Sequence, residues 1–288
     1  MVALFALTTA LLMGLADVGG GLLTRRAPAL TVVVASQTIA VVVLFAIVVA
    51  TGAWREVGPQ LWYAVAAGVI GPVALLCFYQ ALAIGPMGVV SPLGSLGVAV
   101  PFGAGLLMGE RPGLLQVAGV AVAVCGIVLA GGPELRGEPV RRRALTLTLG
   151  AAFGFGAVMA LIAEASSTLP GLFLALFVQR LTNVAVGGAA LYATVRRGKR
   201  ALPEEGGLHV LWTSLPLLAF VGLADVASNG TYSLAAQAGP VTVAAVLSHL
   251  YPVVTVVTAL LLLKERLRGI QATGAGLALA GAVLLATG

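Results

Sequence analysis

The sequence predicts an all-α integral membrane protein with ten transmembrane helices, built as two inverted five-helix repeats. Three observations lead to this fold class. The 288 residues are 60% hydrophobic and only 9% charged, whereas an ordinary soluble domain has roughly 25% charged residues. The apolar residues gather in long runs, and roughly 20 such residues suffice for a helix to cross a bilayer. The order of features in the first half of the chain also recurs in the second half.

Each predicted span is an apolar run that ends at charged residues or at Gly and Pro clusters, which mark loops. Because a bilayer offers no partners for backbone groups, runs of this length are expected to be helical. The longest connections, 131–144 and 195–209, are too short for an extramembrane domain. In chain order the predicted spans are 3–23, 31–51, 61–83, 90–108, 114–130, 145–163, 171–194, 210–234, 241–263 and 270–286.

The motifs that are missing exclude several kinds of chemistry. Cys77 and Cys125 lie inside apolar runs, so a disulfide framework or a CxxC site is not expected. The chain contains no HExxH motif, no recognisable Ser/His/Asp set and no GxxxxGK[ST] phosphate-binding loop. We therefore predict no enzyme activity, no cofactor and no metal. The net charge of +6 belongs to short loops, which favours contact with lipid headgroups and not with nucleic acid.

The central connection over 132–144 combines Pro, Gly and a charge run, and it divides the spans five and five. This pattern predicts a first repeat over 1–131, a linker over 132–144 and a second repeat over 145–288. An odd number of spans forces the second copy to enter the membrane inverted, as in many secondary transporters. The recurring features are Tyr79 with Gly85-Pro86 and Tyr232 with Gly239-Pro240, Gly109-Glu110-Arg111 and Lys264-Glu265-Arg266, Gln37 and Gln179, and Gly14 and Gly154.

The paired ending of each half, from Gly85-Pro86 to Gly126 and from Gly239-Pro240 to Gly281, resembles the EamA branch of the drug/metabolite transporter superfamily. The resemblance covers essentially the whole chain. It implies a ten-helix fold that exports metabolites or amino acids and has both termini in the cytoplasm. The first half departs from the pattern at one position, where Gly97 stands in place of the proline found at Pro252 in the second half.

The basic residues of the loops predict the opposite orientation. With the N-terminus inside, the inward connections hold 2 Arg or Lys and the outward connections hold 13. Cytoplasmic loops are normally the richer in Arg and Lys, so the charge count favours both termini outside. Charge and family resemblance therefore disagree about orientation, and the sequence leaves both alternatives open. In either orientation we expect a multi-pass protein of a bacterial plasma membrane.

Three ionisable residues lie at hydrocarbon depth, namely Asp17, Arg180 and Asp225. Burying such a group costs at least about 2.5 to 3.5 kcal/mol on insertion scales, so each should face protein or water and find a partner. Arg180 and Asp225 are expected near the midplane of adjacent spans, where they can pair. We expect the two aspartates to bind the coupling cation and Arg180 to receive an anionic group of the substrate.

Polar side chains extend this group along the same helices. Asn183 lies at i+3 from Arg180, while Asn229 and Tyr232 lie at i+4 and i+7 from Asp225. Such a polar stripe is typical of a helix that lines a water-filled cavity, although interhelical hydrogen bonds that only fix packing produce the same pattern. Further candidates at matching depths are Gln179, Gln37, Gln80 and Tyr79.

Two other features have two interpretations each, and a third has one. His249 is either a proton relay or a hydrogen-bonded core residue. The glycines at 19–21 either break the first helix or allow close packing. Glu110 and Glu265 stand just before a span, where each is expected to cap the helix that follows it.

Taken together, these features predict a secondary active transporter that exports small polar metabolites or amino acids. We expect alternating access to a central cavity, coupled to a proton or another cation. One alternative is a carrier that flips lipid or lipid-linked headgroups, in which Arg180 would meet a phosphate. A second alternative is a non-transporting membrane subunit, in which the polar stripe would face another helix without a cavity.

Overall fold

The computed structural model describes residues 1–24, 26–84, 94–130, 142–198, 200–202, 207–251, 253–255, 257–258, 269–270, 273–274, 276–277, 280–281 and 284. Every regular element within these ranges is an α-helix or a 3-10 helix. Among the described residues, five helices are long and apolar enough to cross a membrane, and there are six such spans if one bent pair of helices is counted as a single span. The predicted all-helical, multi-span fold class is therefore confirmed. Most of the linker at 132–144, residues 252, 256 and 259–263 of the ninth predicted span, Glu265 and about half of the tenth span lie outside the described residues.

The first half of the chain follows the predicted spans closely through its first three helices. Each of these begins and ends within two residues of the prediction, because charged or Gly/Pro residues follow each apolar run and also precede the second and the third. A 3-10 turn, η1 (Ala53–Glu56), follows the second helix. The α-helices of this half are α1 (Val2–Thr24), α2 (Ala29–Thr51), α3 (Leu61–Ile84), α5 (Ala99–Leu107) and α6 (Leu114–Ala130).

The fourth span differs from the prediction of one helix over 90–108. Its described part begins with a 3-10 turn, η2 (Ser95–Val98), and only then becomes the nine-residue α5. The backbone at Gly97 packs directly on the sixth span, and a Cβ added there would lie 2.3 Å from the carbonyl oxygen of Ala152. This close approach explains why the first half has a glycine where the second half has Pro252.

The second half contains α7 (Arg142–Glu164), α8 (Leu169–Arg196), α9 (Gly207–Thr213), α10 (Leu215–Ala238) and α11 (Val241–Ser248). The eighth predicted span, 210–234, is not one straight helix, because α9 and α10 meet at an angle of 60°. Pro216 lies in the first turn of α10 and has no backbone N–H to continue the helix from α9. The sequence interpretation missed this break.

The triple glycine of the first span does not break its helix, since α1 is continuous from Val2 to Thr24. Gly19 instead faces α10, where an added Cβ would lie 2.7 Å from Cγ2 of Val221. Of the two interpretations of this run, close packing is therefore the one that the structure supports.

Glu110 also caps a different helix from the one predicted. Its Oε2 accepts a hydrogen bond from the backbone N–H of Thr242 at 2.9 Å, and its Oε1 accepts one from Val241. Both amides belong to the first turn of α11, in the other half of the chain. The prediction that Glu110 caps the following helix, α6, is therefore wrong, because tertiary packing brings α11 closer to the carboxylate.

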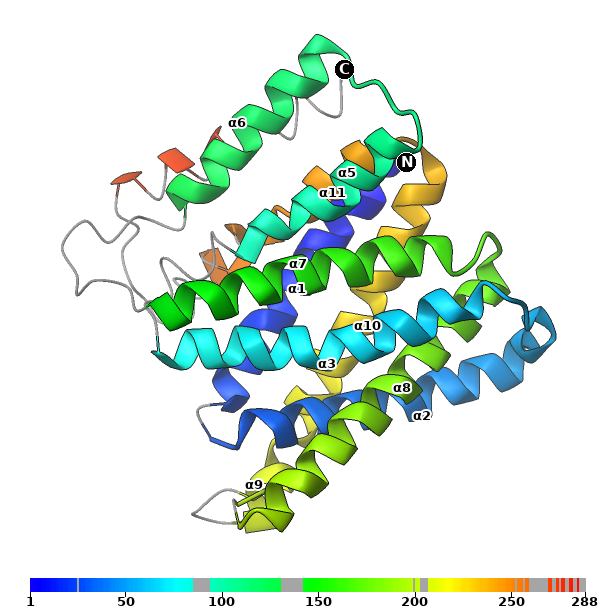
Figure 1. Cartoon of the computed structure of the whole chain (residues 1–288), viewed down its shortest axis with the longest axis vertical. Helices are drawn as coiled ribbons and strands as arrows, with labels where there is room; N and C mark the ends of the chain where they lie inside the picture. Colours follow the sequence, from blue (N-terminus) through cyan, green and yellow to red (C-terminus); the bar gives the residue numbers. More distant parts are fainter. Residues whose placement is uncertain are drawn as a thin grey trace.

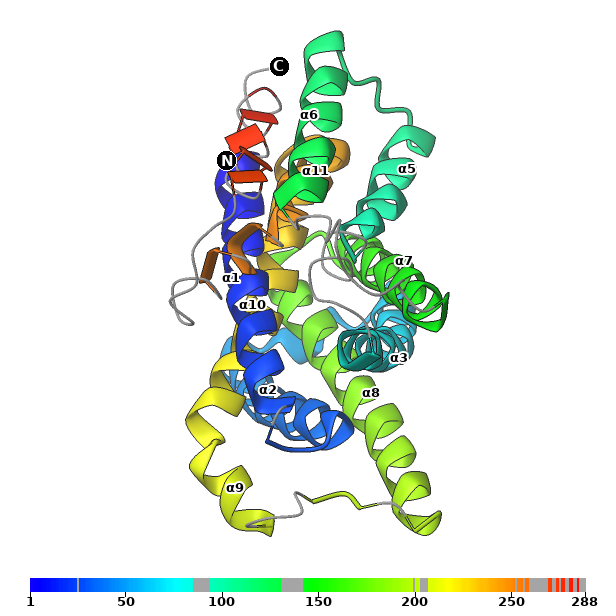
Figure 2. The same ribbon diagram turned by 90° about the vertical axis from the view of Figure 1, so that its left-hand side faces the viewer.

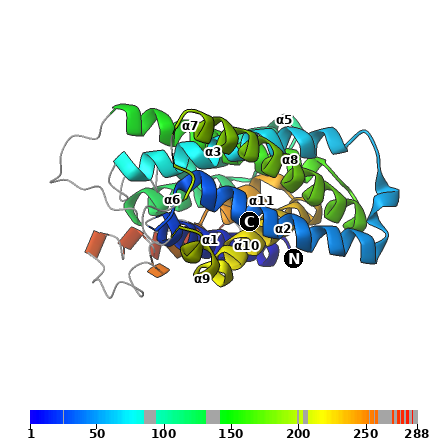
Figure 3. The same ribbon diagram turned by 90° about the horizontal axis from the view of Figure 1, so that it is seen from below.

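The two halves are packed together because helices of one half lie against helices of the other half (Figures 1 and 2). The first helix of one half packs on the third span of the other, so α1 packs along α10 and α7 packs along α3. The second spans, α2 and α8, cross each other between these pairs. Viewed from below, α3, α7 and α8 lie toward one side of the molecule, while α1 and α10 lie toward the other (Figure 3). This reciprocal packing is what two related five-helix units would produce.

Candidate functional site

A cavity of about 70 Å³ lies where six helices converge. Three of these helices belong to the first half and three to the second, and each contributes three residues to the wall. The lining residues are Met13, Ala16 and Asp17 of α1, Val33, Ser36 and Gln37 of α2, Gly71, Pro72 and Leu75 of α3, Phe155, Val158 and Met159 of α7, Gln179, Arg180 and Asn183 of α8, and Val221, Asp225 and Asn229 of α10.

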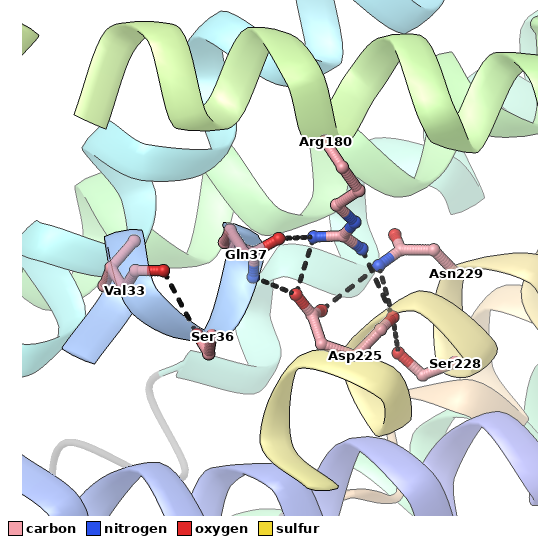
Figure 4. Close-up of polar contacts among 7 residues, drawn as sticks. All are labelled: Val33, Ser36, Gln37, Arg180, Asp225, Ser228 and Asn229. Atoms are coloured by element: carbon pink, nitrogen blue, oxygen red, sulfur yellow. Dashed lines mark hydrogen bonds and ion pairs between the residues drawn. The ribbon is translucent and has the colours of Figure 1, made fainter. Parts of the chain in front are cut away.

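An ion pair between α8 and α10 lies in the wall of this cavity and is joined to α2 of the other half by Gln37 (Figure 4). Nη1 of Arg180 lies 2.6 Å from Oδ2 of Asp225 and donates a second hydrogen bond to Oε1 of Gln37 at 2.9 Å. Gln37 in turn donates from Nε2 to the same Oδ2 at 2.8 Å. The three side chains form a closed triangle on α8, α10 and α2, in which each side chain hydrogen bonds to the other two.

The backbone of α10 also takes part in this network. The carbonyl oxygen of Asp225 accepts hydrogen bonds from Nη2 of Arg180 at 3.3 Å and from Oγ of Ser228 at 2.8 Å. Asn229 donates from Nδ2 to that carbonyl at 2.9 Å and to Oδ1 of Asp225 at 3.2 Å. The Arg180 side chain is only 3% exposed, whereas that of Asp225 is 32% exposed. The carboxylate is therefore the more accessible member of the pair.

Other polar atoms of the wall have no partner among the described residues. These are Oε1 of Gln179, Oδ1 of Asn183 and Nε of Arg180, all fully buried. Asp17 faces the cavity from α1 and forms no ion pair with any residue that the structure describes. Buried polar atoms normally find hydrogen-bond partners, and these three atoms are exceptions within the described residues.

A family comparison decides what kind of protein carries this cavity. The model of the EamA-like transporter family matches residues 1–132 and again residues 142–287, which together make up almost the whole chain. The chain belongs to the EamA-like transporter family. Its fold class, two five-helix units of one multi-pass membrane transporter, follows from that double match and from the structure.

Solved structures support the fold of this EamA-like transporter. One crystal structure superposes with a TM-score of 0.75 over 98% of this chain and 95% of the other, at 18% sequence identity. At that identity the similarity concerns the fold alone. A search among curated proteins gives no match.

Seven of the eleven site residues expected from sequence line the cavity of the transporter, three are placed elsewhere, and the side chain of one is not described. His249 is buried at the end of α11 with Nδ1 2.9 Å from the carbonyl oxygen of Ala245. Tyr232 is fully buried in an apolar cluster, and Gln80 is exposed. The side chain of Tyr79 lies outside the described residues. The seven lining residues are Asp17, Gln37, Gln179, Arg180, Asn183, Asp225 and Asn229.

Sequence analysis missed Ser36, Gly71 and Pro72, which also line the cavity. A signal for the last two was present, because a proline inside an apolar run removes a backbone hydrogen bond within a helix. Pro72 has no N–H to donate to the carbonyl four residues earlier, yet α3 continues through it. Within the described residues, no group of three or more His, Cys, Asp or Glu side chains could hold a metal ion.

Proposed function

We propose that this EamA-like transporter is a secondary active transporter that exports small polar metabolites or amino acids by alternating access. The observation that carries the proposal is the central cavity, which is lined equally by both halves and contains the ionisable triad of Asp17, Arg180 and Asp225. Ionisable residues at membrane depth are costly and mark substrate or ion pathways. Three ionisable residues around an internal space are not expected in a membrane subunit whose helices only pack against each other.

The even division of the wall supports alternating access. In inverted-repeat transporters the binding site lies between the repeats, and access changes when one repeat moves against the other. We assign the two moving units to residues 1–131 and 145–288, joined by a linker at 132–144. Because α1 packs on α10 and α7 on α3, a movement of either unit changes the helix packing on both sides of the cavity.

The ion pair offers a way to couple a cation to the substrate. A proton or another cation that reaches the accessible carboxylate of Asp225 weakens its attraction for Arg180. The guanidinium is then free to receive an anionic group such as a carboxylate, which it binds with two parallel hydrogen bonds. In the absence of the cation, Asp225 and Gln37 occupy the Nη1 donor of Arg180.

The structure gives less support to a carrier of lipid headgroups. Such a carrier needs an arginine that can be reached from the lipid, whereas Arg180 is 2% exposed and enclosed by α2 and α10. We propose a location in the bacterial plasma membrane. Protease or thiol-reagent access to a tag on each terminus in intact cells would determine which of the two orientations is correct.

Flux measurements test the proposed function. The purified protein would be reconstituted into proteoliposomes, and the counterflow of a panel of labelled amino acids would be compared between the parent, Arg180→Ala and Asp225→Asn. We expect both variants to lose most of the flux, because each leaves a charge without its partner. Arg196→Ala is the matched control, since Arg196 lies on the exposed end of the same helix. Unchanged flux in both cavity variants would contradict the assignment.

A further inference from the structure

The first turn of α11 has no cap from its own segment of the chain. The helix begins at Val241, and the residue before it, Pro240, makes no capping hydrogen bond through its side chain. Thr242 is only 2% exposed, so this helix start is shielded from bulk water. The N–H groups of a buried helix start need an acceptor from elsewhere. The carboxylate of Glu110 supplies it from the other half of the chain, with Oε2 2.9 Å from the backbone nitrogen of Thr242.

The turn at the end of α5 fixes the position of Glu110. Gly109 has a φ of +94°, and the backbone N–H of Glu110 donates to the carbonyl oxygen of Gly105 at 3.1 Å. Together with the hydrogen bond from Gly109 to Leu106, these features form a Schellman motif, which ends a helix and sets the direction of the chain after it. Oε2 of Glu110 lies close to α5, because a Cβ added to Gly105 would be 2.7 Å from it. The carboxylate is therefore held between α5 and α11.

The Glu110 contact, defined as its hydrogen bonds to Val241 and Thr242, joins the two halves of the molecule. α5 belongs to the first half and α11 to the second, and the two helices lie side by side (Figures 1 and 2). Hydrogen bonds to a carboxylate are stronger than those between neutral groups, and a negative charge at a helix N-terminus also interacts favourably with the helix dipole. A movement that separates the fourth span from the ninth has to break this contact and leave buried N–H groups without an acceptor.

We propose that the Glu110 contact is a conformational lock, which holds the fourth and ninth spans together in the observed state and breaks when the transporter changes access. The proposal rests on the proposed function, because alternating access requires the two repeats to move against each other. The residues of the contact do not line the central cavity. Removing the lock should therefore shift the balance between conformations without changing the groups that face the cavity.

Distances between two spin labels test the proposal. The labels would be attached to Met108→Cys and Ala238→Cys, two exposed positions that flank the contact, in the full-length protein with Cys77→Ser and Cys125→Ser. Distance distributions would be measured by electron paramagnetic resonance in lipid vesicles. We expect Glu110→Ala to raise the ratio of the separated to the close population by about twofold to thirtyfold, the range that corresponds to a lost capping side chain. Glu110→Gln, which keeps one acceptor oxygen, should have a smaller effect in the same direction.

A reversible cross-link tests whether the two spans must separate during transport. A Cβ on Gly105 would lie 2.9 Å from Cγ2 of Thr242, which is close enough for a disulfide between cysteines at these two positions. In Gly105→Cys combined with Thr242→Cys, we expect oxidation to abolish most of the counterflow of the labelled amino acid that the parent carries fastest, and a reductant to restore it. The matched control for the spin labels is Glu164→Ala, which removes an exposed carboxylate at the end of α7 and should leave the distances unchanged.

Two results would overturn the proposal. Identical distance distributions in the parent, Glu110→Ala and Glu164→Ala would mean that Glu110 caps a helix and has no part in the conformational change. Full counterflow through the completely cross-linked protein would refute the lock as well. Neither result decides the proposed function, which is judged by the flux of the Arg180 and Asp225 variants. Separated labels in Glu110→Ala together with unchanged flux in those two variants would retain the lock and reject the assignment of the cavity.

Discussion

The two halves of the molecule have the same helical framework but different chemistry at related positions. The offset of 142 residues that relates Gln37 to Gln179 also relates Thr38 to Arg180. The offset of 153 residues that relates Tyr79 to Tyr232 relates Pro72 to Asp225. Both members of the ion pair therefore come from the second half, and their first-half counterparts are uncharged.

The two halves therefore share a helical framework, whereas the ion pair belongs to the second half alone. Pro72 still lines the cavity, but Thr38 is exposed and hydrogen bonds to the carbonyl oxygen of Val34 on its own helix. The second half supplies the ion pair, and the first half contributes Gln37, which hydrogen bonds to both members of the pair, and the side chain of Asp17.

We expect the largest effect on stability from removing Arg180, the cationic side chain of the ion pair in the second half. Arg180→Ala leaves Asp225 and Asp17 as two uncompensated carboxylates around one small cavity. Removing one member of a buried pair costs about 3 to 5 kcal/mol, so we expect a large drop in the thermal unfolding midpoint of the purified protein. Adding Asp225→Asn to Arg180→Ala should recover part of the loss. A double variant as unstable as the single one would show that the charge is not the cause.

The second prediction breaks the contact between the halves. A Cβ on Gly156 of α7 would lie 2.2 Å from the carbonyl oxygen of Gly97 in the fourth span. We expect Gly156→Ala to destabilise the protein by about 1 to 3 kcal/mol, because backbone cannot move aside as a side chain can. Gly150→Ala, on the same helix with nothing within 4 Å, should be neutral or slightly stabilising. Equal midpoints for the two variants would contradict the close crossing.

The third prediction concerns the cap that crosses from one half to the other. Glu110 accepts hydrogen bonds from Val241 and Thr242 at the start of α11. Loss of a capping side chain costs about 0.5 to 2 kcal/mol, and we expect Glu110→Ala to lower stability by that amount. Glu164→Ala removes a comparable but exposed carboxylate and should have little effect. A matching loss in both variants would mean that general charge, and not the cap, is responsible.

The smallest effect is expected at Thr38, and it tests whether the first-half counterpart of Arg180 contributes to the site. Thr38→Ala changes the counterpart of Arg180 in the first half, at an exposed site. We expect a change in stability within about 0.5 kcal/mol and an unchanged flux in proteoliposomes. A loss of flux comparable to that of Arg180→Ala would show that the first half contributes more to the site than its lining residues indicate.

Much of the site could be predicted from the sequence, because charge in a bilayer is rare and informative. The sequence places the ionisable residues Asp17, Arg180 and Asp225 at hydrocarbon depth in the bilayer. All three line the cavity. Tyr232 could not be placed in this way. It shares a helix face with Asp225, but seven residues advance a helix by about 10 Å, beyond the end of a small cavity and into an apolar cluster.

The sequence by itself determined the helical class, the first three spans and the internal duplication, since hydropathy and loop charges act locally along the chain. Only the tertiary structure decided which helices meet. Glu110 reaches α11 of the other half, Gln37 joins the Arg180–Asp225 pair, and Asp17 faces the same cavity without a partner among the described residues. These contacts depend on the interlocking of two halves that are distant in sequence, and no local pattern encodes them.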